Sequence, residues 1–132
     1  MNINIQQVTM LKTSEQEPTN MNEEQVTLVE IIGEVDTNTA PLIQERILPL
    51  AQAGIKMILE MTKVPYMSSA GLRMLLSLYR QISAQEGKIV LVGLSEEIQD
   101  TMSITGFLEF FNTCDTIDLA FAALNVQVPS LK

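Results

Sequence analysis

The sequence predicts an α/β fold in which a mixed, mostly parallel β-sheet opens with an antiparallel hairpin and carries about four helices. Two apolar stretches near the start of the chain flank a polar segment, which is typical of a hairpin. Strand-like and helix-like apolar periodicities then alternate, which is typical of a parallel sheet covered by helices. With 132 residues and 46% hydrophobic content, residues 1–132 are expected to form a single domain.

The opening hairpin is predicted from residues 3–11 and 26–32. Both segments are rich in isoleucine, valine and other apolar residues, which favour strands. The segment between them contains Pro18 together with asparagine and threonine residues, which favour a loop. We therefore expect residues 13–24 to form a mobile hairpin loop.

The first helix is predicted over residues 40–50. The preceding run Asp-Thr-Asn-Thr at 36–39 offers several N-caps, and Pro41 suits the first turn of a helix. Apolar residues then recur at helical spacing until Gly54, which ends the pattern.

Two strands and a second helix follow. Residues 55–61 alternate in the manner of a half- to fully-buried strand, and residues 88–91 begin a continuous apolar run that fits a strand covered on both faces. Between them, after Pro65, an apolar stripe at helical spacing continues until Gly87. The stripe consists of Leu72, Leu75, Leu76, Tyr79 and Ile82.

The last third of the chain predicts two more helices. Ser95 followed by two glutamates favours a helix start, because a hydroxyl caps the free amides and carboxylates favour the positive end of the helix dipole; Gly106 ends this helix. Residues 107–112 are expected to form a short strand, residues 115–125 a helix, and residues 126–132 a flexible tail. The expected buried side of the last helix holds Ile117, Leu119, Ala120, Ala123 and Leu124.

Charge excludes several classes of partner. The 16 acidic and 8 basic residues give a formal net charge of −8. A surface of this sign repels phosphate backbones and anionic lipid headgroups, so we expect no nucleic-acid and no membrane partner. No stretch reaches the roughly 18 apolar residues of a spanning helix, and the N-terminus has no signal-peptide pattern, so we expect a cytoplasmic protein.

The residue inventory disfavours catalysis. The chain has no histidine, which removes the commonest general base and the histidine-containing zinc sites. Its single cysteine, Cys114, forms no internal disulfide, which fits a reducing compartment, and we expect it to be a small buried apolar residue. We therefore expect no enzyme activity, no metal and no cofactor.

Two loops are candidates for function, because ligands and partners of such folds usually meet the carboxyl ends of the strands. These loops are residues 33–38 and 63–71. The second carries adjacent serines, Ser68 and Ser69, at a helix start. A serine here is either a structural N-cap or a phosphorylation site, since helix amides and the helix dipole accept a phosphate. Asp36 in the first loop is likewise a helix cap, a partner contact, or both.

The chain resembles the STAS domains of bacterial anti-sigma factor antagonists. The resemblance rests on IIGEVDTNTA, YMSSAGLRMLLSLYRQI and KIVLVGLSEEIQDTMSITGF, and it extends over most of the chain. In that family the loop usually reads Asp-Ser-Ser-Gly-Leu-Gly, and the first serine is phosphorylated. Alignment through Gly71 and Leu72 puts Ser69 at this serine and Ser68 at the aspartate. Asp36 matches the acidic residue of the family's Gly-Glu-Leu-Asp turn, beside the phosphorylation loop.

Two residues depart from the family pattern. Ser68 lacks the charge of the aspartate and supplies a second hydroxyl, so it is the alternative phosphorylation site to Ser69. Arg73 stands where the family often has glycine, and it adds a positive charge in the first helical turn. This arginine is either a solvated helix position or a contact to a partner's acidic residue or to the phosphate.

The resemblance implies a regulatory binding module without catalysis. The unphosphorylated protein would bind an anti-sigma factor that is also a serine protein kinase, and so release a sigma factor. That kinase would phosphorylate Ser69, and a serine phosphatase acting on phospho-Ser69 would restore binding. The implied partner-binding residues are Asp36, Thr37, Asn38, Met67, Ser68, Ser69, Leu72 and Arg73.

An alternative hypothesis is a phosphorylation-independent STAS scaffold, or an accessory subunit of a stress-signalling or transport complex. The replacement of the family aspartate by Ser68 keeps this alternative open. The mass of the protein after expression beside the kinase separates the two hypotheses, because only the first adds a phosphate.

Overall fold

The chain begins with two strands and then alternates helices with strands. The computed structural model describes residues 1–12, 23–124 and 126–127. The strands are β1 (Asn2–Lys12), β2 (Glu23–Ile32), β3 (Lys56–Lys63), β4 (Lys88–Val92), β5 (Asn112–Cys114) and β6 (Val126–Gln127). The helices are α1 (Ala40–Ile47), α2 (Ser69–Ala84), α3 (Glu96–Thr105) and α4 (Ile117–Ala123), with short 3₁₀ helices η1 (Leu48–Leu50) and η2 (Phe107–Phe110).

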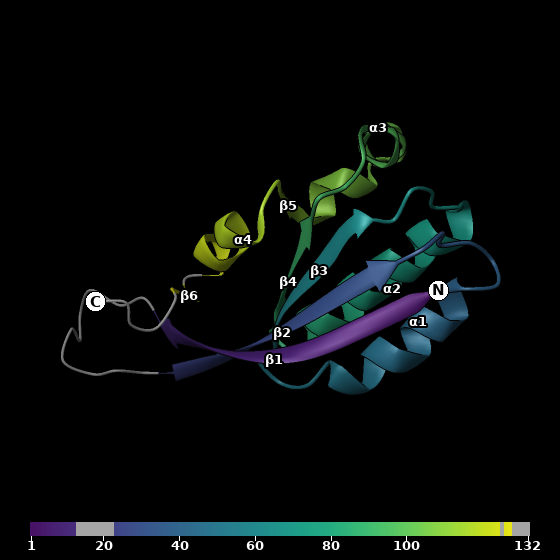
Figure 1. Ribbon diagram of the computed structural model, residues 1–132. Helices are drawn as coiled ribbons and strands as arrows, with labels where there is room; N and C mark the ends of the chain where they lie inside the picture. The colour runs from purple at the N-terminus through teal and green to yellow at the C-terminus, as the bar shows by residue number, and fades with distance from the viewer. Residues whose placement is uncertain (13–22, 125, 128–132) are drawn as a thin grey trace.

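The strands form one mixed sheet in the order β5-β4-β3-β2-β1-β6 (Figure 1). β1 is antiparallel to β2 and to β6, and the pairs from β2 through β5 are parallel. This confirms the predicted α/β class, with its opening hairpin and mostly parallel sheet. The carboxyl ends of β2, β3 and β4 therefore lie at the same edge, where the loops before α1, α2 and α3 begin.

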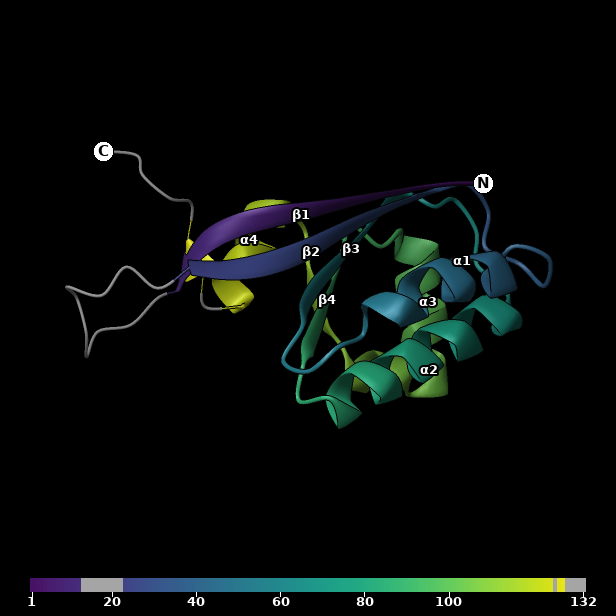
Figure 2. The same ribbon diagram turned by 90° about the horizontal axis from the view of Figure 1, so that it is seen from below.

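Apolar side chains cover both faces of the sheet. Met57 and Leu59 of β3 belong to the core cluster that packs with α1, α2 and α3. Ile58, between them, points to the opposite face and packs with Ala120 and Leu124 at α4. Figure 2 shows α1, α2 and α3 together on one side of the sheet. Because the two faces share β3, this strand reads as a continuous apolar run at its centre.

The two hairpin strands, β1 and β2, extend beyond the apolar residues 3–11 and 26–32 that predicted them. Residues 13–22 of the expected loop lie outside the described residues, but Glu23 and Glu24 belong to β2, where they pair with Leu11 and Met10. The expected loop 13–24 was therefore too long at its end. Pairing with β1 extends β2 beyond its apolar positions, since a backbone ladder needs no apolar side chain.

Part of the expected tail 126–132 is also paired. Val126 and Gln127 form β6, which lies opposite Lys12 and Leu11 of β1. Residues 128–132 lie outside the described residues. The two-residue strand has no periodicity of its own, so its pairing follows from the position of β1 and not from its sequence.

The segment before α4 differs from the prediction as well. Residues 107–110 form η2 instead of a strand, and the strand that follows is β5 at 112–114. Gly106 has a φ of +81°, which ends α3 and turns the chain. The ring of Phe111 then packs against Tyr79 of α2 with a centroid distance of 5.4 Å. Tertiary contact with α2 therefore decides the conformation of these aromatic residues.

The buried side of α4 is narrower than predicted. Ala120 and Leu124 are fully buried, while Leu119 is 54% exposed and Ala123 is exposed. Ile117 and Phe121 are partly buried against the same cluster, which gives helical spacing at 117, 120, 121 and 124. Cys114, expected to be buried, is half-buried beside this cluster.

Core truncation tests these two faces. We expect Leu75→Ala to lower the free energy of unfolding by about 2–5 kcal/mol, because Leu75 is fully buried on the side of α2 that packs in the core. Leu119→Ala is the matched control on α4, and its expected change is within about 0.5 kcal/mol. Urea denaturation followed by circular dichroism measures both. A loss from Leu119→Ala as large as that from Leu75→Ala would contradict the observed orientation of α4.

Candidate functional site

The two loops predicted to carry function are joined by backbone hydrogen bonds. The amide of Gly33 donates to the carbonyl of Lys63 at 3.0 Å, and the amide of Val35 donates to the carbonyl of Tyr66 at 2.9 Å. The carbonyl of Val35 accepts from the amide of Ser68 at 2.8 Å. Val35 is fully buried, so this one residue connects the two loops through its backbone and packs beneath their surface. The loops therefore form one continuous surface at the right-hand end of the sheet in Figure 1.

Asp36 caps the turn that leads into α1. Its carboxylate oxygen Oδ1 accepts hydrogen bonds from the backbone amides of Asn38 at 2.9 Å and Thr39 at 3.0 Å. In return, Thr39 Oγ1 accepts from the Asp36 amide at 2.9 Å and donates to the Glu34 carbonyl at 2.8 Å. The helix-cap role that the sequence offered for Asp36 is wrong, because the N-cap of α1 is Thr39 and no side chain caps this helix. Asp36 instead closes the turn just before the helix.

These hydrogen bonds favour the charged form of Asp36. The amide of Thr39 is the main cause that lowers the pKa of Asp36 below its ordinary value of 3.8, and the amide of Asn38 adds to it. Partial burial acts in the opposite direction but is the smaller effect. The loop surface therefore carries a fixed negative charge at neutral pH.

The two adjacent serines differ in their surroundings. Ser68 is the N-cap of α2: it is half-buried, and its Oγ accepts from the Gly71 amide at 3.4 Å. Ser69 is the first residue of α2 and is exposed, and its hydroxyl has no hydrogen-bond partner among the described residues. Of the two roles open to these serines, capping thus falls to Ser68, and Ser69 presents a free hydroxyl at the helix N-terminus.

Gly71 allows α2 to begin close to the first loop. A β-carbon at this position would lie 2.5 Å from Met67 Cγ and 2.8 Å from Val35 Cγ1, which is closer than packed carbon atoms approach. Glycine therefore lets the first turn of α2 pack directly on Val35. This contact holds Ser69 and the 33–39 loop side by side.

The predicted partner-binding residues divide by exposure. Thr37, Asn38 and Arg73 are exposed, as is Ser69, and Asp36 is half-buried. Met67 and Leu72, which were expected to take part in binding, are only 8% and 5% exposed. Both side chains are therefore largely buried and support the loop from within. Met67 is buried because its backbone pairs with that of the buried Val35 in a parallel bridge.

Sequence reasoning missed the neighbouring face of α3. Tyr66 is 49% exposed and borders a small hollow of about 80 Å³ that is lined also by Glu97, Ile98 and Thr101. The start of α3 follows β4, so the carboxyl-edge rule that selected the first two loops applies to this loop as well. Glu97 adds a second carboxylate near the loop surface.

Two kinds of site are absent from the part of the chain that the structure describes. Within residues 1–12, 23–124 and 126–127, no three acidic or cysteine side chains gather as metal ligands would. None of the helices in that part of the chain has the length and apolar character of a bilayer-spanning segment. What the arrangement provides is an exposed hydroxyl at a helix N-terminus, with a fixed carboxylate in the loop beside it.

The pKa of Asp36 makes the stability of the loop pH-dependent. A carboxyl whose pKa is lowered by folding stabilises the protein above its ordinary pKa, and this stabilisation is lost as the pH falls through the folded value. We expect Asp36→Ala to be less stable than wild type at about pH 7, and the difference to shrink at about pH 3. Urea midpoints at the two pH values measure it, with Asp100→Ala on the exposed face of α3 as control. An equal difference at both pH values would contradict the capping of this turn.

Comparisons with known proteins agree with this geometry. The STAS domain family model matches residues 18–120. The anti-sigma-B factor antagonist of Bacillus subtilis (strain 168) is 32% identical over 84 residues, which cover 64% of this chain and 77% of that protein. The solved structure of an anti-sigma-factor antagonist (STAS) domain protein from Planctomyces limnophilus has a TM-score of 0.69 at 16% identity, with 88% and 97% of the two chains covered. The structure of the Bacillus cell fate determinant SpoIIAA in its phosphorylated form has a TM-score of 0.58 at 16% identity, with 89% and 99% covered. The chain therefore belongs to the STAS domain family, and the relative that it matches by sequence is named an anti-sigma factor antagonist.

Proposed function

We propose that this protein is an anti-sigma factor antagonist controlled by phosphorylation of Ser69. The unphosphorylated form binds an anti-sigma factor that is also a serine kinase, and this binding releases a sigma factor. The kinase then phosphorylates Ser69, and a serine phosphatase removes the phosphate. The name of the sequence relative supports the antagonist role. The exposed hydroxyl of Ser69 beside a capping Ser68 is the observation that carries the switch.

The geometry favours Ser69 over Ser68 as the phosphoacceptor. A kinase must bring the hydroxyl in line with the γ-phosphate of ATP, which requires an accessible side chain. Ser69 is exposed, whereas Ser68 is half-buried and its Oγ accepts from Gly71. Ser68 stands where the family has an aspartate, and its Oγ caps α2 without a negative charge. With Ser68 as the cap, the hydroxyl of Ser69 stays available as the phosphoacceptor.

A phosphate on Ser69 changes the charge of the loop surface without unfolding it. It adds about −1.5 to −2 charges, and the amides and dipole at the start of the 16-residue α2 accept this charge. The fixed carboxylate of Asp36 lies in the neighbouring loop, so a partner shaped for the unphosphorylated surface meets added negative charge. Burying that charge in an interface without a partner is costly. Binding is therefore lost while the domain stays folded.

The partner contacts this surface through exposed side chains. These are Thr37 and Asn38 of the first loop and Ser69 and Arg73 of α2, with Asp36 beside them. Arg73 lies one helical turn after Ser69 on the same side of α2. In this role the protein supplies no catalytic group and uses no cofactor, and we place it in the cytoplasm, where the kinase and sigma factor act.

Replacement of each serine tests the acceptor. After incubation with ATP and the serine-kinase anti-sigma factor from the same genome, wild type and Ser68→Ala are expected to gain the mass of one phosphate. Ser69→Ala is expected to gain none, because it lacks the exposed hydroxyl. Intact-mass spectrometry measures all three.

Two other outcomes have a defined meaning. A phosphate that persists on Ser69→Ala and disappears from Ser68→Ala assigns the switch to Ser68. An unmodified wild type that still binds the kinase supports the alternative, a phosphorylation-independent STAS scaffold.

A charge placed at Ser69 tests the effect on binding. We expect Ser69→Glu to weaken the complex with the anti-sigma factor at least about 30-fold, because the new carboxylate is desolvated beside Asp36. Ser83→Glu makes the same substitution at an exposed position near the other end of α2 and is expected to bind like wild type. Isothermal titration calorimetry measures both affinities. Equal affinities for the two variants would place the interface elsewhere on the domain.

A further inference from the structure

We infer that the outer edge of β1 is a self-association surface, on which a second copy of this chain pairs through its own β1. β1 pairs with β2 over ten consecutive positions, from Asn2 opposite Ile32 to Leu11 opposite Glu23. On its other side, β6 pairs only with Leu11 and Lys12. Within the described residues, the outer backbone edge of residues 2–10 therefore faces no strand.

This edge lacks the features that usually prevent strand addition. Residues 2–11 read NINIQQVTML and contain no charged residue, no proline and no glycine. The register with β2 is unbroken, so no bulge twists the edge away. Natural proteins commonly protect open edges with charges, prolines or bulges. In a chain with 18% charged residues, ten consecutive uncharged positions in a strand whose outer side is mostly unpaired among the described residues favour pairing with another strand.

The second copy is the occupant that the charges favour. Each chain carries a net charge of −8, which opposes association through most of its surface. In an antiparallel pair of two β1 strands about a two-fold axis, residues 2–10 of the two copies lie opposite one another, and all of these are uncharged. With the axis at Gln6, Asn4 of one copy lies opposite Val8 of the other, and Gln6 lies opposite Gln6.

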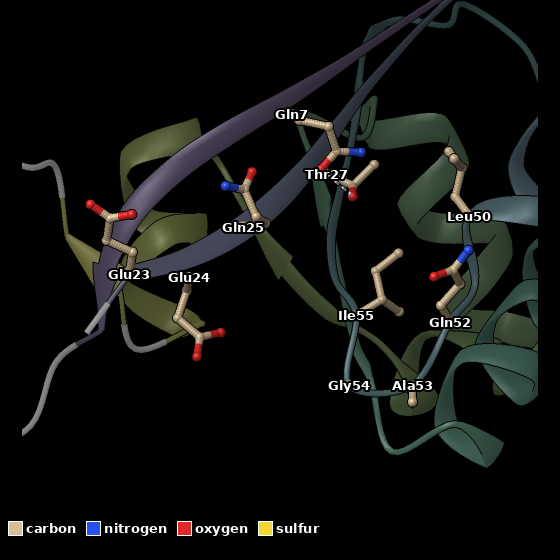
Figure 3. A pocket seen from close by; sticks show the side chains of 10 residues that line it. All are labelled: Gln7, Glu23, Glu24, Gln25, Thr27, Leu50, Gln52, Ala53, Gly54 and Ile55. Carbon is tan, nitrogen blue, oxygen red and sulfur yellow. Dashed lines mark hydrogen bonds between the residues drawn. The ribbon is translucent and has the colours of Figure 1, made fainter.

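A hollow of about 420 Å³ lies beside the end of the hairpin that contains Gln7 and residues 23–27 (Figure 3). It runs between the two hairpin strands and the segment that connects η1 to β3. Its described lining includes Gln7, Gln52 and the carboxylates of Glu23 and Glu24. Glu24 lies 3.4 Å from Lys56 Nζ, so Glu23 is the carboxylate of this lining that has no ion pair among the described residues. Figure 3 shows Glu23 and Glu24 on one wall and Gln52 on the other.

The opposite end of the hairpin, at residues 1–4, lies beside a positive charge that complements these carboxylates. There, Arg46 of α1 lines a second groove, of about 360 Å³, together with Leu42, Asn2 and Asn4. Leu42 is 51% exposed, so apolar surface accompanies the cation. Glu45 shares this lining.

Antiparallel pairing places opposite ends of the two hairpins side by side. The first residues of β1 in one copy then lie beside the last residues of β1 in the other. Arg46 of each copy is thereby brought toward Glu23 in the hollow of the other copy. The same ion pairs form twice, as an isologous interface requires.

Light scattering coupled to size-exclusion chromatography tests the proposal on the whole chain. Wild type is expected to approach twice the 14.7 kDa mass of one chain as its concentration rises. Gln6→Lys is expected to weaken the dimer at least about tenfold, because two lysines then face each other at the axis. Gln81→Lys adds the same charge on the exposed face of α2 and is expected to dimerise like wild type. A wild type that stays monomeric at every concentration overturns the proposal.

A charge exchange tests the geometry of the pair. Arg46→Glu and Glu23→Arg are each expected to weaken the dimer about tenfold, and the double variant to recover most of the loss. Glu45→Gln is expected not to weaken it. Dimerisation that is unchanged in both single variants overturns the antiparallel arrangement. Phosphorylation of Ser69 in the Gln6→Lys monomer tests the switch separately, so failure of one proposal leaves the other standing.

Discussion

The position of Val35 under the two loops determines the geometry of the candidate site. Its amide and carbonyl bond to Tyr66 and Ser68, and its side chain is packed against the first turn of α2 where Gly71 has no β-carbon. A larger residue at 71 would push α2 away from the first loop. Because the first loop carries the charge of Asp36 and α2 carries Ser69, this contact sets how strongly the two groups affect each other.

The two serines illustrate how a helix N-terminus separates structure from signalling. The N-cap oxygen must point back to the helix amides, which fixes the side chain of Ser68. The next residue, Ser69, has its side chain outside the helix and is free to react. In the proposed switch, a phosphate on Ser69 would stay close to the same amides, so the helix would accept its charge while the outer surface changed. The proposed switch therefore needs no change in the fold.

The distribution of charge along the chain is as informative as its sum. The net charge of −8 disfavours contact with a phosphate backbone, which is consistent with the proposed action through a protein partner. Against this background residues 2–10 of β1 are unusual, since they are uncharged and no described strand pairs with their outer side, where charge would normally protect the backbone. The loop surface of Asp36 and Ser69 and the β1 edge use different parts of the domain, which allows a partner and a second copy to bind without competing for the same residues.

The sequence alone determined the α/β class, the order of the main strands and helices through α4, and the family, because these depend on local periodicity, on caps and on a contiguous motif. It also singled out the two loops that hold Asp36, Ser68 and Ser69, which the structure joins by backbone hydrogen bonds. The role of these residues in binding stays a prediction. Only the tertiary structure decided that Met67 and Leu72 are buried, that η2 replaces a strand, and that Ser68 and not Ser69 is the cap. Each of these outcomes depends on contacts with segments distant along the chain, such as Val35 beneath Met67 and Tyr79 against Phe111. Local pattern carries no information about such contacts, so burial and hydrogen bonding at the site became visible only in the folded chain.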